Sequence, residues 1–418
     1  FFWNNELCAK RLINLIYAYD YYAVSATKNE RYLLSKIIHK HYFVLKTQEN
    51  IVLKKNNSRI EISKALFLFE SIHKISTKKT IENIIFKVDR HVNENGMHNS
   101  MNPSVHIEYL NHLFEIKNMF LFFKFEIPKI IELKINEMSM VLKNLFHKDN
   151  TIAFFNGSND ANYESMSKLN KKIIDVKPKN LSNIKNGIAI FESKKLKIFF
   201  DTVKPTSRLI NDNLHASTLS FEFSYDKEKI ITNCGSMEKR IGKKPEFLRY
   251  SAAHSTIILN NTNISELVEN KSYKRIPKTI LIDCYENEND IIWTASHDGY
   301  QDNFKKVIKR KLIISKTKAQ IFGEDNIIST KINKSKQNYD IRFHLSPICS
   351  CLLTNNQKAV LIKTNQSQSW VFESESKLTL QDSIYIKDGK RVNKTKQIVL
   401  SGYATQNKKT EKWQLYKI

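Results

Sequence analysis

The chain has 418 residues, of which 41% are hydrophobic and 26% charged, as is ordinary for a globular protein of two or more domains. Only 9 glycines and 7 prolines argue against a fibrous or low-complexity chain, and no window approaches about 18 uncharged apolar residues, so no membrane-spanning helix is predicted. The 67 Lys and Arg against 42 Asp and Glu give a formal charge of +25, which attracts polyanions. Richness in Lys, Asn and Ile, typical of an AT-biased genome, is an alternative origin of this charge.

The distribution of basic residues and the number of cysteines bear on which partners and which kinds of structural cross-link the chain has. Basic runs such as KSYKR and IKRKL are scattered along the whole chain instead of following one helix, so we expect no nucleic-acid partner. The five cysteines are odd in number and form no CxxC pair, which predicts neither a disulfide framework nor a zinc ribbon. Because the chain begins at Phe1 without a methionine, we expect its native N-terminus to lie upstream, and an export signal is not readable.

Apolar residues recur at three- and four-residue steps from Glu6 to about Phe146, the period of amphipathic helices. The helical segments are LCAKRLINLIYAYDYY, ERYLLSKIIHKHYFVL, SRIEISKALFLFESIHKI, TIENIIFKVDRHV and PSVHIEYLNHLFEIKNMFLFF. Short polar breaks separate them, and no strand pattern intervenes. Such a series predicts antiparallel helical hairpins that form an α/α superhelix or toroid over residues 1–175.

Near residue 150 the clustered Asn, Gly and Ser of DNTIAFFNGSNDANYES indicate a boundary. From about Gly187 onward, short alternating runs bounded by turn residues follow one another, among them GIAIFES, LKIFFDTV, TLSFEFS, TILIDCY, YDIRFHLS and KQIVLSGYA. So many short strands without intervening helices predict a large antiparallel β-sandwich over residues 186–418. The expected fold class is α+β multidomain, with an N-terminal (α/α) helical toroid followed by this sandwich.

A set of motifs in a fixed order resembles the heparinase II/III-like family. The motifs are ENGMHNSMNPS in the helical half, then HASTLSFEFS, ITNCG, LRYSAAHSTIIL, ASHDGY, FGEDNI, IRFHLSP and SIYI. The resemblance covers almost the whole chain and implies a polysaccharide lyase that cleaves an anionic, uronate-containing glycan by β-elimination in a cleft between toroid and sandwich. It also implies an acidic polysaccharide partner and a location in the periplasm or cell envelope.

β-Elimination requires three groups. One neutralises the uronate carboxylate, a base removes the C5 proton, and an acid protonates the departing glycosidic oxygen. The family's Asn-His pair at the start of a toroid helix falls on Asn57 and Ser58, so the resemblance assigns carboxylate neutralisation to Asn57. A helix N-cap is the alternative role for this residue. Arg249 is a second candidate, because its planar fork binds carboxylates, with a surface ion pair as the alternative.

In ENGMHNSMNPSVHIEYL the family's Asp-Gly, Ser-Pro and His match Asn95-Gly96, Asn102-Pro103 and His106, but Val105 occupies the family's tyrosine position. Tyr109 lies four residues on, hence on the same helix face, and is the replacement acid. His98 is the candidate base and Asn102 a candidate substrate-binding residue. A surface histidine and a core tyrosine are the alternative interpretations of His98 and Tyr109.

The resemblance also implies one structural zinc in the sandwich, with His215, Asn233 and His254 in the ligand positions. Asn213 stands where the family often has a catalytic histidine and is therefore a candidate substrate-binding residue, as is Tyr300 in the ASHDGY turn. Asn233 replaces a carboxylate by an amide, a poorer zinc ligand, so a metal-free histidine pair remains the alternative. The departures at Val105 and Asn213 leave a second hypothesis open, a catalytically degenerate lyase-fold protein that binds or handles cell-surface polysaccharide.

Overall fold

The computed structural model describes residues 3–52, 59–161, 163–183, 187–205, 215–237, 246–267, 273–331, 336–405 and 407–418. The chain divides into two compact units, a helical unit (Phe1–Asn99 with Ile107–Ser139) and a sandwich unit (Ser100–His106 with Met140–Ile418). The change from consecutive helices to consecutive strands falls between α8 (Tyr163–Lys172) and β1 (Ile188–Glu192). Helices therefore come first and sheets second, in the predicted order.

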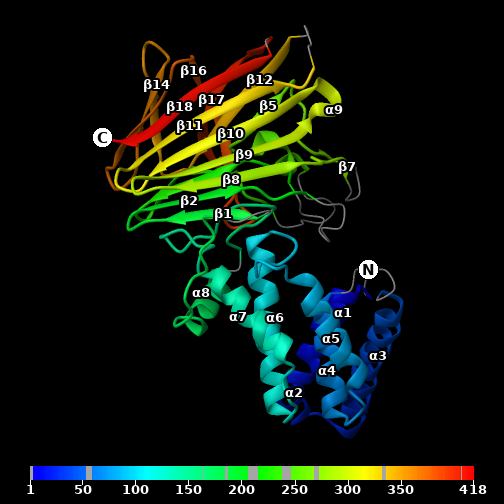
Figure 1. The fold of residues 1–418 in the computed structure, drawn as a ribbon. Helices are drawn as coiled ribbons and strands as arrows, with labels where there is room; N and C mark the ends of the chain where they lie inside the picture. The colour runs from blue at the N-terminus through cyan, green and yellow to red at the C-terminus, as the bar shows by residue number, and fades with distance from the viewer. Residues whose placement is uncertain are drawn as a thin grey trace. The chain divides into compact units, whose positions relative to one another are not determined.

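Helix α4 is the centre of the helical unit. Every side chain from Ile60 to Glu70 is buried, including charged ones, because helices on several sides cover it. Helices α5 and α6 contribute most to the site described below. The helices that begin or end in this unit (Figure 1) are α1 (Asn5–Tyr17), α2 (Tyr19–Ala23), α3 (Lys28–Val52), α4 (Ile60–Ile72), α5 (Lys78–His91), α6 (Pro103–Phe122) and α7 (Lys129–Leu142).

Two large antiparallel sheets form the sandwich unit (Figure 1). The first sheet has the order β1, β2 (Leu196–Asp201), β3 (Phe221–Tyr225), β4 (Glu228–Thr232), β12 (Gln337–Leu345), β17 (Asn393–Ala404) and β16 (Leu378–Tyr385), with β5 (Ile257–Leu259) paired to β12. The second sheet has the order β13 (Ser350–Leu353), β14 (Ala359–Lys363), β15 (Ser369–Ser374), β18 (Lys408–Lys417), β11 (Gln320–Ser329), β10 (Lys306–Ser315), β9 (Asp290–Tyr300) and β8 (Ile280–Glu286). A separate two-stranded sheet pairs β6 (Glu266–Leu267) antiparallel with β7 (Tyr273–Arg275). A four-residue helix, α9 (Gln301–Phe304), follows β9.

Aromatic side chains fill the space between the two sheets. Burial alternates along β9 and β10, as expected for strands with one face toward a core. Trp293 of β9 stacks on Phe200 of β2 with ring centroids 5.9 Å apart, and Trp413 of β18 meets Phe343 of β12 at 4.8 Å. Gly323 makes room for the second pair, since a Cβ there would lie 2.0 Å from the Trp413 ring.

A fully buried ion pair lies in the same core. Arg310 donates to both carboxylate oxygens of Asp325, at 2.6 and 3.0 Å, and its remaining NH groups reach the Leu219 and Ser255 carbonyl oxygens at 2.8 Å. The Trp413 indole also donates to Asp325 at 3.0 Å. This geometry satisfies both charges, as burial of an ion pair requires.

Candidate active site

Three aromatic side chains of the helical unit meet at one end of α5 and α6. His91 is the last residue of α5, His98 lies in the loop that follows, and Tyr109 lies in α6. The ring of His98 is 4.9 Å from that of Tyr109, and the ring of His91 is 5.6 Å from Tyr109 and 5.9 Å from His98. The predicted base and the predicted acid are thus in contact.

The loop that carries His98 is fixed by backbone hydrogen bonds and by a glycine. An antiparallel bridge joins Val92 to His98, and the Asn93 side-chain oxygen accepts from the backbone NH groups of Asn95 and Met97 at 3.0 Å. Gly96 has φ +81, and a Cβ at this position would lie 2.9 Å from the Glu137 carbonyl oxygen. A side chain at residue 96 would therefore displace the loop that orients His98.

The hydroxyl of Tyr109 is buried, and it has no hydrogen-bond partner among the residues that the structure describes. Burial raises the pKa of Tyr109 well above its ordinary value, and the negative charge of Glu61 adds to this. The hydroxyl is therefore protonated near neutral pH. Such a group can donate a proton or a hydrogen bond but cannot act as a base.

His91 is a member of this cluster that sequence reasoning missed. It is 8% exposed, and burial together with the positive charge of Lys87 lowers its pKa to about 4. A neutral imidazole at this place can accept a proton or a hydrogen bond. The only sequence signal was its position at the end of an amphipathic helix, seven residues before His98, which does not distinguish it from a core residue.

A charged network surrounds the same helices. Burial alone would raise the pKa of Glu61, but its interaction with His112 lowers the pKa to about 2. Burial also opposes protonation of His112, whose pKa is nevertheless raised by Glu115 and Glu61. Lys64 lies 3.0 Å from His112 Nδ1 and pairs with Glu115. Glu61 is also the carboxylate whose negative charge adds to the raised pKa of Tyr109.

Glu61, Glu108 and His112 place one donor atom each within 4.8 Å of one another, the one such group of three in the described part of the chain. Glu108 and His112 are four residues apart on α6, and Glu61 faces them from α4. The ammonium of Lys64 already contacts His112, and a positive group at this distance opposes binding of a cation. We therefore interpret the group as an ion-pair network.

Asn102 caps α6 within the sandwich unit. Its side-chain oxygen accepts from the backbone NH of Val105 at 3.1 Å, and its NH₂ donates to the Asn156 carbonyl oxygen at 2.8 Å. The residue is 1% exposed. Both ends of the amide thus make hydrogen bonds inside the protein, so this placement gives Asn102 a structural role as the cap of α6.

Of the three predicted zinc ligands, His215 and His254 are in contact, and Asn233 makes its hydrogen bonds elsewhere. His215 Nδ1 and His254 Nε2 are 3.1 Å apart, in buried surroundings, and burial lowers the pKa of His254 to about 3. Asn233 instead accepts from the Ser255 backbone NH at 3.0 Å and donates to the Phe154 carbonyl oxygen at 3.1 Å. In the described residues, no third His, Cys, Asp or Glu donor completes a group with the pair. Among the described residues, two imidazoles alone fill only half of the positions of a four-coordinate zinc.

Arg249 and Tyr300 are both buried in the sandwich unit. Arg249, at the end of a short 3-10 helix (Glu246–Arg249), is 7% exposed and lies 3.9 Å from Glu246. The Tyr300 hydroxyl is within 3.2 Å of the Ile257 and 3.0 Å of the Thr262 carbonyl oxygens, and its side chain is fully buried. Tyr300 thus joins β9 to the β5 segment, which is a structural role. The other two predicted site residues, Asn57 and Asn213, lie outside the described residues.

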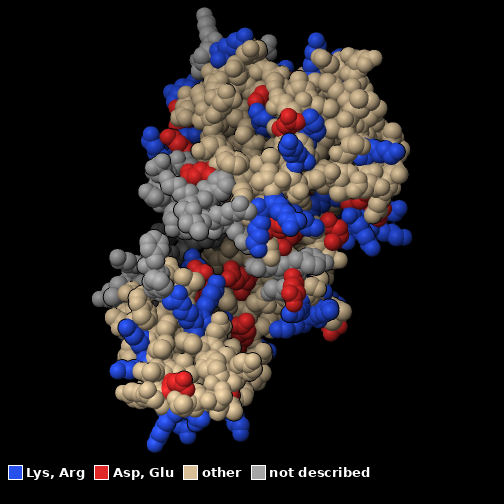
Figure 2. Space-filling view, turned by 180° about the vertical axis from the view of Figure 1, so that it is seen from behind, with Lys and Arg blue, Asp and Glu red and all other residues tan. Residues whose placement is uncertain are grey.

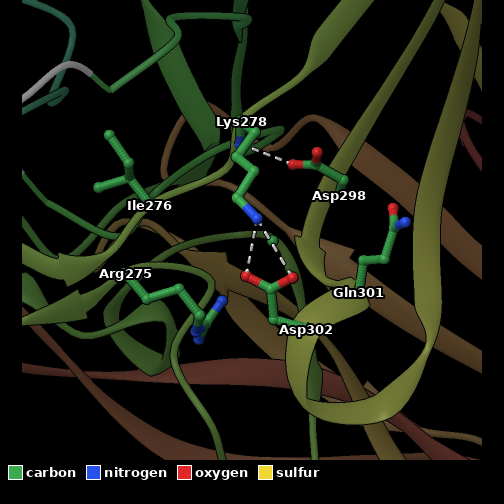
Figure 3. A pocket seen from close by; sticks show the side chains of 7 residues that line it. Arg275, Ile276, Lys278, Asp298, Gln301 and Asp302 are labelled. Atoms are coloured by element: carbon green, nitrogen blue, oxygen red, sulfur yellow. Dashed lines mark hydrogen bonds and ion pairs between the residues drawn. The ribbon is translucent and has the colours of Figure 1, made fainter.

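Two pockets of the sandwich unit are polar. The smaller one has a volume of about 50 Å³ and is shown in Figure 3, where Lys278 reaches Asp302 at 3.2 Å and its backbone NH donates to Asp298 at 2.7 Å. That volume is far below the roughly 300–1,000 Å³ of small-molecule sites. The larger pocket, of about 440 Å³, is lined by Glu246, Tyr250, Asn261, Thr262, Asn263, Glu266 and Asn303. Its size and its amide and carboxylate groups suit a polar ligand.

Comparison with known proteins gives one family match. The family model described as "Heparinase II/III-like, C-terminal" matches residues 182–414. No curated protein sequence matches the chain. No helix among the described residues is long and apolar enough to cross a membrane.

Several solved structures are similar over the whole chain. A heparinase III with methylated lysines has a TM-score of 0.76 at 13% identity, and the match covers 100% of this chain and 67% of that one. The heparan sulfate lyase HepC from Pedobacter heparinus has a TM-score of 0.70 at 13% identity and coverages of 99% and 68%. Another heparinase III has a TM-score of 0.75 at 11% identity and coverages of 100% and 69%. At this identity the likeness shows the fold, and it confirms the predicted helical toroid followed by a β-sandwich.

Proposed function

Since the chain belongs to the heparinase II/III-like family, we propose that it is a polysaccharide lyase that cleaves an anionic, uronate-containing glycan by β-elimination. The proteins with similar folds are a heparan sulfate lyase and heparinases III. The charge of +25 supports an acidic polysaccharide as substrate, because it attracts polyanions. On the face shown in Figure 2, Lys and Arg lie in several separate groups with acidic side chains between them.

The observation that carries the proposal is the contact between His98 and Tyr109, whose rings are 4.9 Å apart. His98 is half-buried and takes the role of the base that removes the C5 proton. Tyr109, held protonated by burial, takes the role of the acid. As the C5–H bond breaks, its electron pair forms the C4=C5 double bond, and the C4–O bond breaks while the glycosidic oxygen receives a proton.

Two further parts of the proposal follow from this arrangement. The Tyr109 hydroxyl is covered in this structure, so the side chains over it must move before it reaches a glycan. The His91 ring packs against the other two rings and positions them. Asn57 remains the proposed partner of the uronate carboxylate, whose neutralisation makes the C5 proton acidic.

The direct test is turnover. The purified protein is incubated with heparan sulfate, hyaluronan, chondroitin sulfate and alginate, and the ultraviolet absorbance of the unsaturated product is followed. We expect one of these polysaccharides to be cleaved, and His98→Ala to abolish the reaction. His73→Ala, which removes an exposed histidine of the same unit, is the matched control and keeps full turnover. Absence of product from every polysaccharide refutes the lyase proposal.

A second candidate function is a catalytically degenerate protein that binds cell-surface polysaccharide. The buried state of the Tyr109 hydroxyl and the valine at residue 105 favour it. Glycan binding without any product, unchanged by His98→Ala, distinguishes it from the lyase. For either function we propose a location in the periplasm or cell envelope, which fractionation of cells that express the full-length protein tests.

A further inference from the structure

We propose that the helical unit carries a second binding site for an acidic sugar chain, at the end of α4, α5 and α6 opposite to His98. The ligand class rests on the proposed function. The site is a pocket of about 810 Å³, within the range of small-molecule sites. It is lined by Glu70, Ser71, Lys74, Ile75, Ser76, Thr77, Lys78, Ile81, Glu82, Phe123 and Phe125.

The pocket is separate from the cluster of His91, His98 and Tyr109. Helix α5 begins at the pocket with Lys78 and ends at the cluster with His91. Its 14 residues span about 20 Å at roughly 1.5 Å per residue. Helices α4 and α6 run the other way and bring their C-terminal ends to the pocket. A ligand there does not touch the proposed catalytic groups.

A buried carboxylate in the lining has one oxygen without a partner. The side chain of Glu70 is 0% exposed, and its Oε1 accepts from Lys46 at 2.5 Å and from the Tyr42 hydroxyl at 3.3 Å. Its Oε2 has no hydrogen-bond partner among the described residues, and neither has the neighbouring Ser71 hydroxyl. Lys46 and Tyr42 hold the carboxylate in place, so Oε2 is an acceptor at a fixed position. Buried polar atoms of this kind call for a donor.

The remaining lining matches the other parts of a sugar unit. Phe123 and Phe125 offer aromatic surface to the apolar face of a pyranose ring. Lys74 and Lys78 are exposed and attract a uronate or sulfate group, and the exposed carboxylate of Glu82 in the same lining offsets part of their charge. Glu70 Oε2 is covered in this structure, and a sugar hydroxyl is the donor that pairs with it once the side chains over it move aside. An acidic pyranose satisfies all three kinds of group at once, whereas a purely apolar ligand leaves the carboxylate unpaired.

The test uses variants that do not change the net charge. Binding of heparan sulfate and hyaluronan hexasaccharides is measured by calorimetry on the His98→Ala protein, which does not consume them. We expect Phe123→Ala to weaken binding of one of them about tenfold. Phe122→Ala is the matched control, because Phe122 is 80% exposed next to Phe123 and does not line the pocket. Ser71→Ala is a second variant, and thermal unfolding verifies that each protein is folded.

The outcomes separate this site from the proposed reaction. Loss of affinity in Phe123→Ala but not in Phe122→Ala supports the pocket, even where the parent protein yields no unsaturated product and the lyase proposal fails. Equal affinities of Phe123→Ala, Ser71→Ala and Phe122→Ala overturn the pocket, even where turnover is found. Absence of binding of both hexasaccharides overturns it as well.

Discussion

Replacement of Tyr109 by phenylalanine separates the catalytic interpretation of this residue from a purely structural one. The change removes only the hydroxyl, which is buried without a hydrogen-bond partner among the described residues. Leaving such a group unpaired costs about 1–3 kcal/mol, so its removal leaves the free energy of unfolding unchanged or raises it by about 1 kcal/mol. If the hydroxyl is the general acid, its removal lowers turnover about 10²–10⁴-fold, which corresponds to about 3–5 kcal/mol in the barrier.

Two measurements on one variant give this comparison, the initial rate of unsaturated product formation and the free energy of unfolding in urea. Tyr21→Phe is the control, because the Tyr21 side chain is 90% exposed. The expected result is a protein at least as stable as the parent but with little turnover. Equal rates in Tyr109→Phe and Tyr21→Phe refute the acid assignment. A clear loss of stability in Tyr109→Phe refutes the argument from the unpaired hydroxyl.

Four further outcomes are expected. Burial, with the charges of Arg275 and Arg310, lowers the pKa of His297 to about 3, so its unfolded form binds a proton below about pH 6.5 while the folded form does not. The free energy of unfolding therefore falls as the pH decreases from about 6.5 toward 3, and this residue accounts for at most about 3 kcal/mol of the fall at pH 4. Urea titrations at about pH 6.5 and at pH 4 should show a smaller fall in His297→Gln than in the parent protein. Asn102→Ala removes the α6 cap and should cost about 1–2 kcal/mol in urea unfolding, in contrast to exposed Asn303→Ala. Arg310→Met should lower the free energy of unfolding in urea by about 3–5 kcal/mol, because it leaves the buried Asp325 carboxylate without its ion-pair partner. The double variant Arg310→Met with Asp325→Leu should lose less stability. Elemental analysis after dialysis should find well below one zinc per chain, and retention of one equivalent contradicts the argument that the described residues offer the His215 and His254 pair no third donor.

Much of the fold follows from local sequence patterns. The three- and four-residue period up to about Phe146 corresponds to α1 to α7, and runs such as LKIFFDTV and YDIRFHLS correspond to β2 and β12. Periodicity identifies these elements because each must bury one face. It does not give strand order, and β12 pairs with β4, β5 and β17, which are far from it in the chain. Such pairings depend on the packing of the whole sandwich.

The candidate site was only partly predictable. The motif ENGMHNSMNPSVHIEYL placed His98 in the loop before a helix and Tyr109 on the helix face of residue 105, and the structure has the two rings in contact. His91 and Glu61 were missed, since a buried histidine and a buried glutamate on amphipathic helices carry no pattern of their own. Asn102 and Tyr300 were predicted as site residues from their motifs, and in the structure their polar groups donate hydrogen bonds to backbone carbonyl oxygens of the protein.

The sequence by itself determined the order of a helical half and a strand-rich half, the motif order that indicates the family, and the positive charge. These properties depend on local periodicity and composition, which the chain carries in linear form. Only the tertiary structure decided that burial keeps the Tyr109 hydroxyl protonated, and that this hydroxyl and Glu70 Oε2 have no hydrogen-bond partner among the described residues. It also decided that the Asn233 amide bonds to Ser255 and Phe154. Each of these depends on burial and on partners distant in sequence, and desolvation and hydrogen bonding act only once those partners are in place.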